Sequence, residues 1–230
     1  MKKNIYKIDN TIEKILNGSS TLFLDSNELK EVTCKLKNKK YNIYYPYSES
    51  DNVILYNNNK PKVSLFEIKC GEKLRHQDIL GSILSLNINS SYLGDIIVDN
   101  DKYYFYILSE LSSFIKDNLS MIGNKKIILE EIDIDILKDY KRKYEEHTII
   151  VSSLRIDNVI SKIINTNRKI VLDKINNKEI ILNYEVLTKS SYNLKENDVF
   201  SIRKYGKYKY IRIINNTKKD NLIIKYLKYI

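Results

Sequence analysis

The order of apolar patterns between residues 63 and 129 constrains the fold of this chain more than any other feature. A strand-type run at 63–68 precedes a helical pattern over 74–86. Two further strand-type runs, 95–98 and 103–107, flank Asp99-Asn100-Asp101, a turn whose residues tolerate left-handed backbone. A second helical stripe from Ser109 to Ile122 then leads to a strand at 126–129. The predicted order is therefore β-α-β-β-α-β.

This order predicts a ferredoxin-like domain, the topology that RNA-recognition domains also use. The third predicted strand carries four consecutive aromatic residues, Tyr103 to Tyr106, that could stack on bases if the sheet face were open. The glycine and aromatic pattern of a true RNA-recognition strand is absent, however. We therefore interpret these aromatic residues as part of the core.

The segments on either side complete an α+β fold class. Residues 1–61 predict a small α/β unit, in which Asp25 with Glu28 three residues later forms a capping box that opens a helix. We assign residues 62–134 to the ferredoxin-like domain. Residues 135–150 form a charged run without strong periodicity, which favours a linker. Residues 151–230 form a separate C-terminal domain.

Net charge distinguishes this last domain. Residues 1–150 hold 22 basic and 22 acidic residues, whereas residues 151–230 hold 17 and 7, so the whole formal charge of +10 lies in the final third. Such asymmetry indicates a phosphate-rich partner. Charge that served only solubility would be spread more evenly.

Other features set the expected compartment and exclude several site types. No stretch approaches the roughly 18 apolar residues of a membrane span. Cys34 and Cys70 are far apart and neither belongs to a Cys-x-x-Cys pair. We expect a cytoplasmic monomer without membrane contact, disulfide, metal site or cofactor.

The C-terminal domain predicts two short helices followed by strands. The helices place Arg155, Arg168, Lys169 and Lys174 at adjoining exposed positions, where they can contact an RNA backbone. A basic run at 203–210 adds Arg203, Lys204, Lys207 and Lys209 around the Gly206 turn, interleaved with tyrosines that can stack on bases. The alternative for this run is a solvated hairpin.

Several motifs here resemble the RNA-binding domain first named from ribosomal protein S4. They are Ser153-Leu154-Arg155-Ile156-Asp157, Asn167-Arg168-Lys169, Ile180, Asn183 and Asn197-Asp198. Lys178 stands where that family has a turn glycine, so Asn176 or Asn177 is expected to supply the left-handed backbone.

A longer resemblance, from about Glu67 to the C-terminus, is to the YlmH family, also called RqcP. It is carried by residues 75–81, 94–96, 151–157, 203–208 and 217–219, and it adds Lys218 and Lys219 to the expected RNA-binding residues. The family's Gly- and Arg-rich N-terminal loop appears here as Tyr45-Pro46-Tyr47-Ser48-Glu49, so an RNA contact made by that loop in relatives would be lost.

The resemblance implies a non-catalytic factor of ribosome-associated quality control. Such a factor binds the large ribosomal subunit carrying peptidyl-tRNA, contacts tRNA and ribosomal RNA, and supports alanine tailing by a partner protein. Two alternatives are an RNA-modifying enzyme targeted by the S4-like domain and a cell-division scaffold. We interpret His76 and Asp78 as cap and packing residues, and His147 has no partner at metal-ligand spacing.

Overall fold

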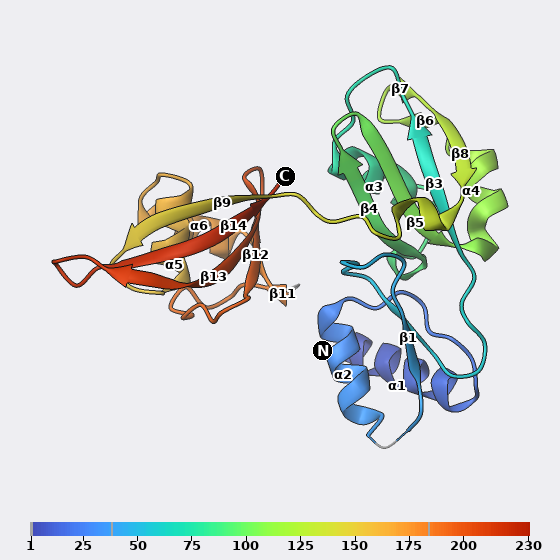
Figure 1. Ribbon diagram of the computed structural model, residues 1–230, viewed down its shortest axis with the longest axis horizontal. Helices are drawn as coiled ribbons and strands as arrows, with labels where there is room; N and C mark the ends of the chain where they lie inside the picture. Colours follow the sequence, from blue (N-terminus) through green and yellow to red (C-terminus); the bar gives the residue numbers. More distant parts are fainter. Residues whose placement is uncertain (1, 38, 184) are drawn as a thin grey trace. The chain divides into compact units, whose positions relative to one another are not determined.

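The chain divides into two compact units, residues 1–141 and 142–230, in a computed structural model (Figure 1). The structure describes residues 2–37, 39–183 and 185–230, with side chains from Ile8 onward. Each unit has its own buried core and is therefore an independently packed body.

The first unit begins with two helices and a two-stranded sheet. The elements are α1 (Lys2–Leu16), α2 (Ser26–Lys35), β1 (Asn42–Tyr44) and β2 (Ile54–Tyr56). The Asp25 carboxylate accepts hydrogen bonds from the amides of Asn27 and Glu28, at 2.8 and 2.9 Å, and the Glu28 side chain accepts one from the Asp25 amide. The predicted capping box is therefore confirmed.

The remainder of this unit is the predicted ferredoxin-like domain. Its sheet has the order β4-β5-β3-β8, every neighbouring pair is antiparallel, and the connection order β-α-β-β-α-β is confirmed. The elements are β3 (Val63–Lys69), α3 (His76–Leu84), β4 (Leu93–Asp99), β5 (Lys102–Leu108), α4 (Ser112–Asn118) and β8 (Ile128–Ile132). Shorter pieces are η1 (Ser90–Tyr92), η2 (Ser109–Leu111), β6 (Met121–Ile122), β7 (Lys125–Lys126) and η3 (Ile134–Leu137).

Both faces of this four-stranded sheet are covered. Tyr103 and Phe105 join one core with Ile79 of α3 and Ile115 of α4, whereas Tyr104 and Tyr106 join another with residues of the N-terminal segment. None of the four consecutive aromatic side chains is more than 6% exposed. Their interpretation as core residues is confirmed, and none can stack on a base without unfolding a core.

Asp95 holds the loop at 45–52 against the sheet, and the adjacent Gly94 leaves room for the Phe23 ring. The buried Asp95 carboxylate accepts hydrogen bonds from the Tyr47 hydroxyl at 2.8 Å, the Asn52 side-chain amide at 2.6 Å and the Asp51 backbone amide at 2.8 Å. A Cβ at Gly94 would lie 2.8 Å from the Phe23 ring. The Gly-Asp pair of the sequence motif is therefore required for packing.

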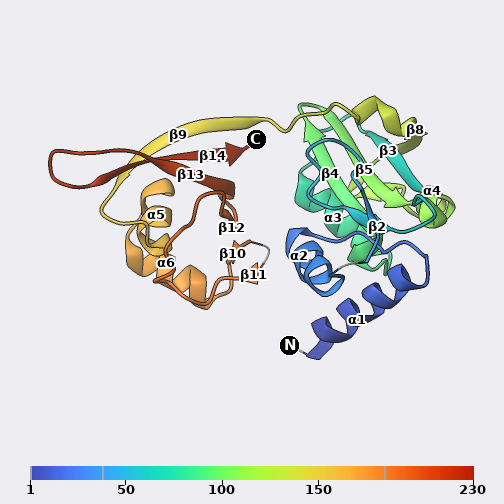
Figure 2. The ribbon, with the colours of Figure 1, turned by 60° about the horizontal axis from the view of Figure 1, so that its bottom comes forward.

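The second unit is a six-stranded antiparallel sheet with two helices on one side (Figure 2). The strand order is β11-β10-β12-β13-β14-β9. The elements are β9 (Tyr144–Val151), α5 (Ile156–Ile163), α6 (Arg168–Asn176), β10 (Ile180–Leu182), β11 (Glu185–Val186), β12 (Val199–Ile202), β13 (Gly206–Asn216) and β14 (Leu222–Tyr229). The core lies between the helices and the sheet and includes Val159, Val171 and Phe200.

The segment expected to be a linker, residues 135–150, differs from that expectation. Its start lies in η3, where Leu137 packs in the core that also holds Tyr47, and its end is strand β9, which pairs with β14 over eight residues. The inward positions of β9 include Glu145 and His147, so its alternation of apolar and polar residues is weak. Because β14 lies more than seventy residues later, no local pattern indicated the pairing.

Candidate nucleic-acid interface

The start of helix α5 holds an arginine in a fixed orientation. Arg155, the N-cap residue, donates from Nε and Nη2 to the two carboxylate oxygens of Asp157, at 3.2 and 2.8 Å. Asp157 is 3% exposed and also accepts a hydrogen bond from the Asn158 amide at 2.8 Å. The Arg155 side chain itself remains 43% exposed, so its other N–H groups can reach a ligand.

The start of helix α6 brings a second arginine to the same carboxylate. Burial by itself would raise the pKa of Asp157, but the hydrogen bonds from Arg155 and the charges of Arg168 and Arg155 outweigh it, so the pKa lies below its usual value. Asn167 caps α6 by accepting a hydrogen bond from the Ile170 amide at 3.0 Å. Arg155 and Arg168 therefore form one cluster around Asp157, with Lys169 next to it in sequence.

A second cluster surrounds Glu179, where α6 ends. Lys174 Nζ lies 2.8 Å from the Glu179 carboxylate and 5.3 Å from the centre of the Tyr205 ring, and the Lys174 side chain is only 16% exposed. The hydrogen bond from Lys174, followed by the charges of Lys174, Arg203 and Lys204, lowers the pKa of Glu179. Lys174 is thus engaged within the protein, while Arg203 and Lys204 are exposed.

The turn between β12 and β13 divides the basic run 203–210. Lys204 and Gly206 have φ angles of +73° and +122°, and this turn leaves Arg203 and Lys204 near Glu179. Lys207 and Lys209 continue along β13, where they alternate with buried Tyr208 and Tyr210. Because side chains alternate along a strand, the two lysines lie on the sheet face opposite the helices.

The ten predicted RNA-binding residues therefore occupy four places in the second unit. They are the Asp157 cluster (Arg155 and Arg168, followed by Lys169), the Glu179 cluster (Lys174, Arg203 and Lys204), the open sheet face (Lys207 and Lys209) and the turn between β13 and β14 (Lys218 and Lys219). Asp157, which organises the first of these, was not among the predicted residues. The spacing Arg-x-Asp at a predicted helix start is the sequence signal that could have identified Asp157.

The turns of the S4-like motif are formed by left-handed residues. Lys178 itself has a φ of +57°, whereas Asn177 has a φ of −78°, so the expectation that an asparagine would supply the turn is wrong. Helix α6 continues through Asn176. The backbone amides of the next two residues donate hydrogen bonds to carbonyl groups in the last turn of the helix before the chain reverses. Asn197 has a φ of +71° and supplies the predicted Asn-Asp turn.

The ferredoxin-like domain of the first unit carries net negative charge. Residues 57–136 contain 9 basic and 12 acidic residues. Asp78 forms an ion pair with the Arg75 side chain, with nitrogen to oxygen distances of 2.7 and 2.8 Å, and also accepts a hydrogen bond from the backbone of Arg75, the N-cap residue of α3. His76 is exposed, so its interpretation as a packing residue is corrected.

Two kinds of feature are absent from the described residues. Within residues 2–37, 39–183 and 185–230, no group of three or more His, Cys, Asp or Glu side chains is placed to hold a metal ion. In the same part of the chain no helix is both long and apolar enough to cross a membrane. Cys34 and Cys70 are free thiols.

Exposed arginines and lysines grouped in this way are typical of proteins that bind nucleic acid. Residues 57–136 match the family described as "Putative RNA-binding domain in YlmH". The matched range covers the ferredoxin-like domain, so the family match and the positive charge fall in different units of the chain.

Two known proteins are similar over a larger part of the chain. The ribosome-associated protein quality control protein P2 of Bacillus subtilis (strain 168) is 25% identical over 162 residues, which cover 69% of this chain and 63% of that protein. The structure of the cell division protein YlmH from Streptococcus pneumoniae superposes with a TM-score of 0.51 at 22% identity, covering 60% of this chain and 94% of that one. Together the comparisons support the YlmH/RqcP family that the sequence motifs predicted.

Proposed function

We propose that this chain is a non-catalytic, cytoplasmic RNA-binding protein that acts on the large ribosomal subunit in ribosome-associated quality control. The observation that carries this proposal is the Asp157 cluster, where Arg155 binds a buried carboxylate directly and the charge of Arg168, at the start of the next helix, acts on the same carboxylate. The name of the Bacillus relative and the RNA-binding family that residues 57–136 match support it.

The Asp157 cluster is suited to binding phosphate. A guanidinium group has five N–H donors in a rigid fork, and Arg155 uses Nε and one terminal nitrogen for Asp157. The donors on its remaining edge can form paired hydrogen bonds with a phosphate. Because Asp157 already holds the side chain, less conformational entropy is lost on binding than for a mobile lysine.

Exposed cations extend this surface along the RNA. Lys169 follows Arg168 on α6, and Arg203 with Lys204 lies where that helix ends. We propose that these groups contact tRNA and ribosomal RNA on a subunit that still carries peptidyl-tRNA, and that the complex supports alanine tailing by a partner factor. Neutralising several phosphates releases counterions, so affinity should fall steeply with salt.

The ferredoxin-like domain has a different role in this proposal. Its matched range has more acidic than basic residues and both faces of its sheet are covered. We propose that it contributes contacts from its loops and helices and that the second unit supplies most of the electrostatic affinity. The likeness to the Streptococcus protein, at 22% identity, concerns the fold and adds nothing to this division of roles.

Co-sedimentation with purified large subunits carrying peptidyl-tRNA tests the proposal. The variant Arg155→Gln/Arg168→Gln should lose association at salt concentrations where the wild-type chain still binds. Lys30→Gln/Lys37→Gln removes the same charge from exposed positions of the first unit and should bind normally. Arg155→Lys keeps the charge next to Asp157 and should bind more weakly than wild type because the planar fork is lost.

Folding of each variant is checked by circular dichroism. Removal of Arg155 takes hydrogen bonds from the buried Asp157 and therefore lowers the stability of the fold. Arg168→Gln alone leaves these hydrogen bonds in place, so it serves as the second variant and should also weaken binding. Undiminished association of a folded double variant would show that the RNA surface lies elsewhere.

A further inference from the structure

The six-stranded sheet of the second unit has one face that the helices leave open. On β9 and β14, Val151, Ile224 and Tyr226 are buried toward α5 and α6. Their sequence neighbours on the same strands must point the other way, because side chains alternate along a strand. Ile150 on this outer side is 53% exposed, which agrees with an uncovered surface.

The strand register places positive charge across this outer face. Lys207 and Lys209 lie on β13, and Lys225 lies on β14 beside the Arg212 position. Glu146 is the one acidic residue at the outward strand positions, all of which the structure describes, and its carboxylate lies 2.6 Å from Lys225 Nζ. Positive charge is therefore in excess on the face that α5 and α6 leave open.

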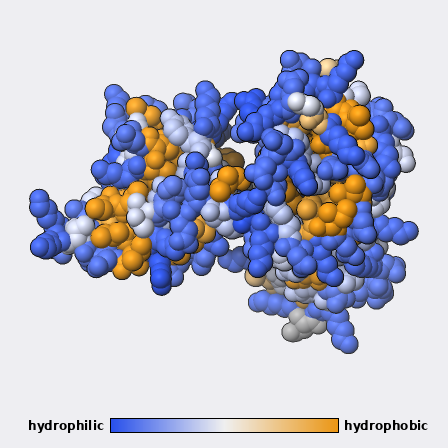
Figure 3. Space-filling model, turned by 45° about the horizontal axis from the view of Figure 1, so that its top comes forward, coloured by the Kyte–Doolittle hydropathy of each residue, from blue (hydrophilic) through white to orange (hydrophobic). Residues whose placement is uncertain are grey.

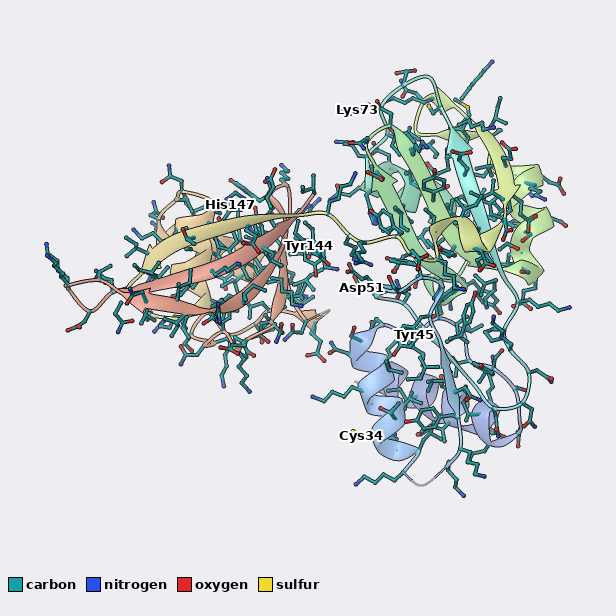
Figure 4. The ribbon with its side chains drawn as sticks, viewed as in Figure 1. Cys34, Tyr45, Asp51, Lys73, Tyr144 and His147 are labelled. Atoms are coloured by element: carbon teal, nitrogen blue, oxygen red, sulfur yellow. The ribbon has the colours of Figure 1, made fainter. Side chains whose placement is uncertain are left out.

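Aromatic rings lie among these cations. The Tyr229 ring is 4.7 Å from Lys207 Nζ, 6.0 Å from the Arg142 guanidinium carbon and 5.0 Å, edge to face, from the Tyr144 ring. Tyr144, near the start of β9, is marked in Figure 4. The register pairs Tyr144 directly with Tyr229, so the last strand of the chain and the first strand of the unit build this group together.

We propose that this outer face is a second RNA-binding surface, separate from the Asp157 cluster, that takes a single-stranded or looped RNA segment. Phosphates would contact Lys207, Lys209 and Arg212, and a base would stack at the Tyr144 and Tyr229 rings. The inference deepens the proposed function and rests on it, because it assigns a further contact to the same RNA-binding unit.

The chemistry of the face favours an RNA strand over a protein partner. Stacked or edge-on aromatic rings next to a groove of positive charge are the common features of surfaces that bind single strands, since every base presents a π-face. Apolar groups on the second unit form separate patches among hydrophilic ones on the side that Figure 3 displays. A protein interface would be expected to gather its apolar residues into one central patch.

Binding to a fluorescent oligouridine of about 12 nucleotides, within the site size of single-strand binders, tests the surface directly. The full-length chain is used throughout. Tyr229→Leu should weaken binding about tenfold through loss of stacking. Lys207→Gln/Lys209→Gln should weaken binding and reduce the slope of log affinity against log salt by about 1.4, since two phosphates of a single strand contribute about 0.7 each.

The control Lys30→Gln/Lys37→Gln removes equal charge from the first unit and should leave both affinity and slope unchanged. Each variant is also tested for co-sedimentation with large subunits beside Arg155→Gln/Arg168→Gln. If the arginine variant loses subunit binding while both sheet-face variants bind oligouridine and subunits like wild type, this inference is overturned and the proposed function stands.

Two other results are decisive. Sheet-face variants that lose subunit association but keep oligouridine binding would assign the face to a ribosomal protein and overturn the RNA assignment. A wild-type chain that binds neither oligouridine nor subunits would reject the proposed function and this inference together.

Discussion

At the scale of single residues, Asp157 determines how the second unit should respond to acid. Its pKa is lowered in the folded chain from the usual value of 3.8, since Arg155 and Arg168 outweigh the effect of burial. A lowered pKa contributes stability that is complete above the unfolded value and is lost as pH falls through the folded value. The unfolding free energy of this unit should therefore decline as the pH drops below 3.8.

Asp157→Asn tests this linkage. It removes charged hydrogen bonds from a buried position and should lower the unfolding free energy at neutral pH by about 1–3 kcal/mol. It should also flatten the decline in acid, because the titrating group is gone. Urea titrations followed by circular dichroism at neutral and acid pH measure both effects, and parallel pH profiles for the two proteins would contradict the prediction.

Lys178 is a second residue whose backbone conformation should measurably lower the free energy of unfolding. It has a φ of +57° immediately after α6, a conformation that costs a side-chain-bearing residue roughly 1–2 kcal/mol. Lys178→Gly should raise the unfolding free energy by about 1 kcal/mol. The adjacent Asn177→Gly is the matched control and should destabilise, because Asn177 has a φ of −78°. Thermal unfolding measures both variants. Equal changes in their stability would show that the backbone at Lys178 is not strained.

At the scale of elements, Gly94 on β4 controls how the N-terminal segment packs on the four-stranded sheet. Gly94→Ala should destabilise the first unit by about 1–3 kcal/mol, since its Cβ would lie 2.8 Å from Phe23 and 2.9 Å from Tyr106 Cβ. Gly81→Ala, within α3 and with nothing in 4 Å of its Cβ, should instead stabilise by up to about 1 kcal/mol. Differential scanning calorimetry compares the two, and a neutral Gly94→Ala would show that the layers can shift apart.

Elements with strong local signals were predictable from the sequence. The Asp25 capping box and the order of strands from Val63 to Ile132 follow from patterns within a few residues. Strand β9 could not be predicted in this way, because half of its inward positions are polar and its partner β14 is distant in sequence. For the same reason no sequence pattern indicated that Arg142, Tyr144 and Tyr229 meet.

At the scale of the whole molecule, the two units have separate cores, and a chain of residues 142–230 should fold alone. Its sheet is complete, with β9 paired along β14, and its helices bury Val159 and Val171 against it. A dispersed amide NMR spectrum and a cooperative thermal transition are expected of this fragment. An unfolded fragment would show that the first unit is required for its stability.

Charge distribution could also be predicted at this scale, whereas the grouping of the charges could not. The excess of basic residues beyond residue 150 was evident from counting. That Arg155 and Arg168 both act on Asp157 depends on how the starts of α5 and α6 are placed, and the separation of Arg203 from Lys207 depends on the positive φ angles of the intervening turn. Both depend on backbone geometry that residue spacing alone does not specify.

The double covering of the four-stranded sheet limits what evolution can do with this domain. A sheet with an open face can change its ligand by exchanging one exposed aromatic residue, but here every aromatic residue of β5 belongs to one of the two cores, so each such exchange would disturb a packed core. New specificity in this half of the chain must therefore arise in its peripheral loops, where insertions and substitutions are tolerated and the buried tyrosines need not change.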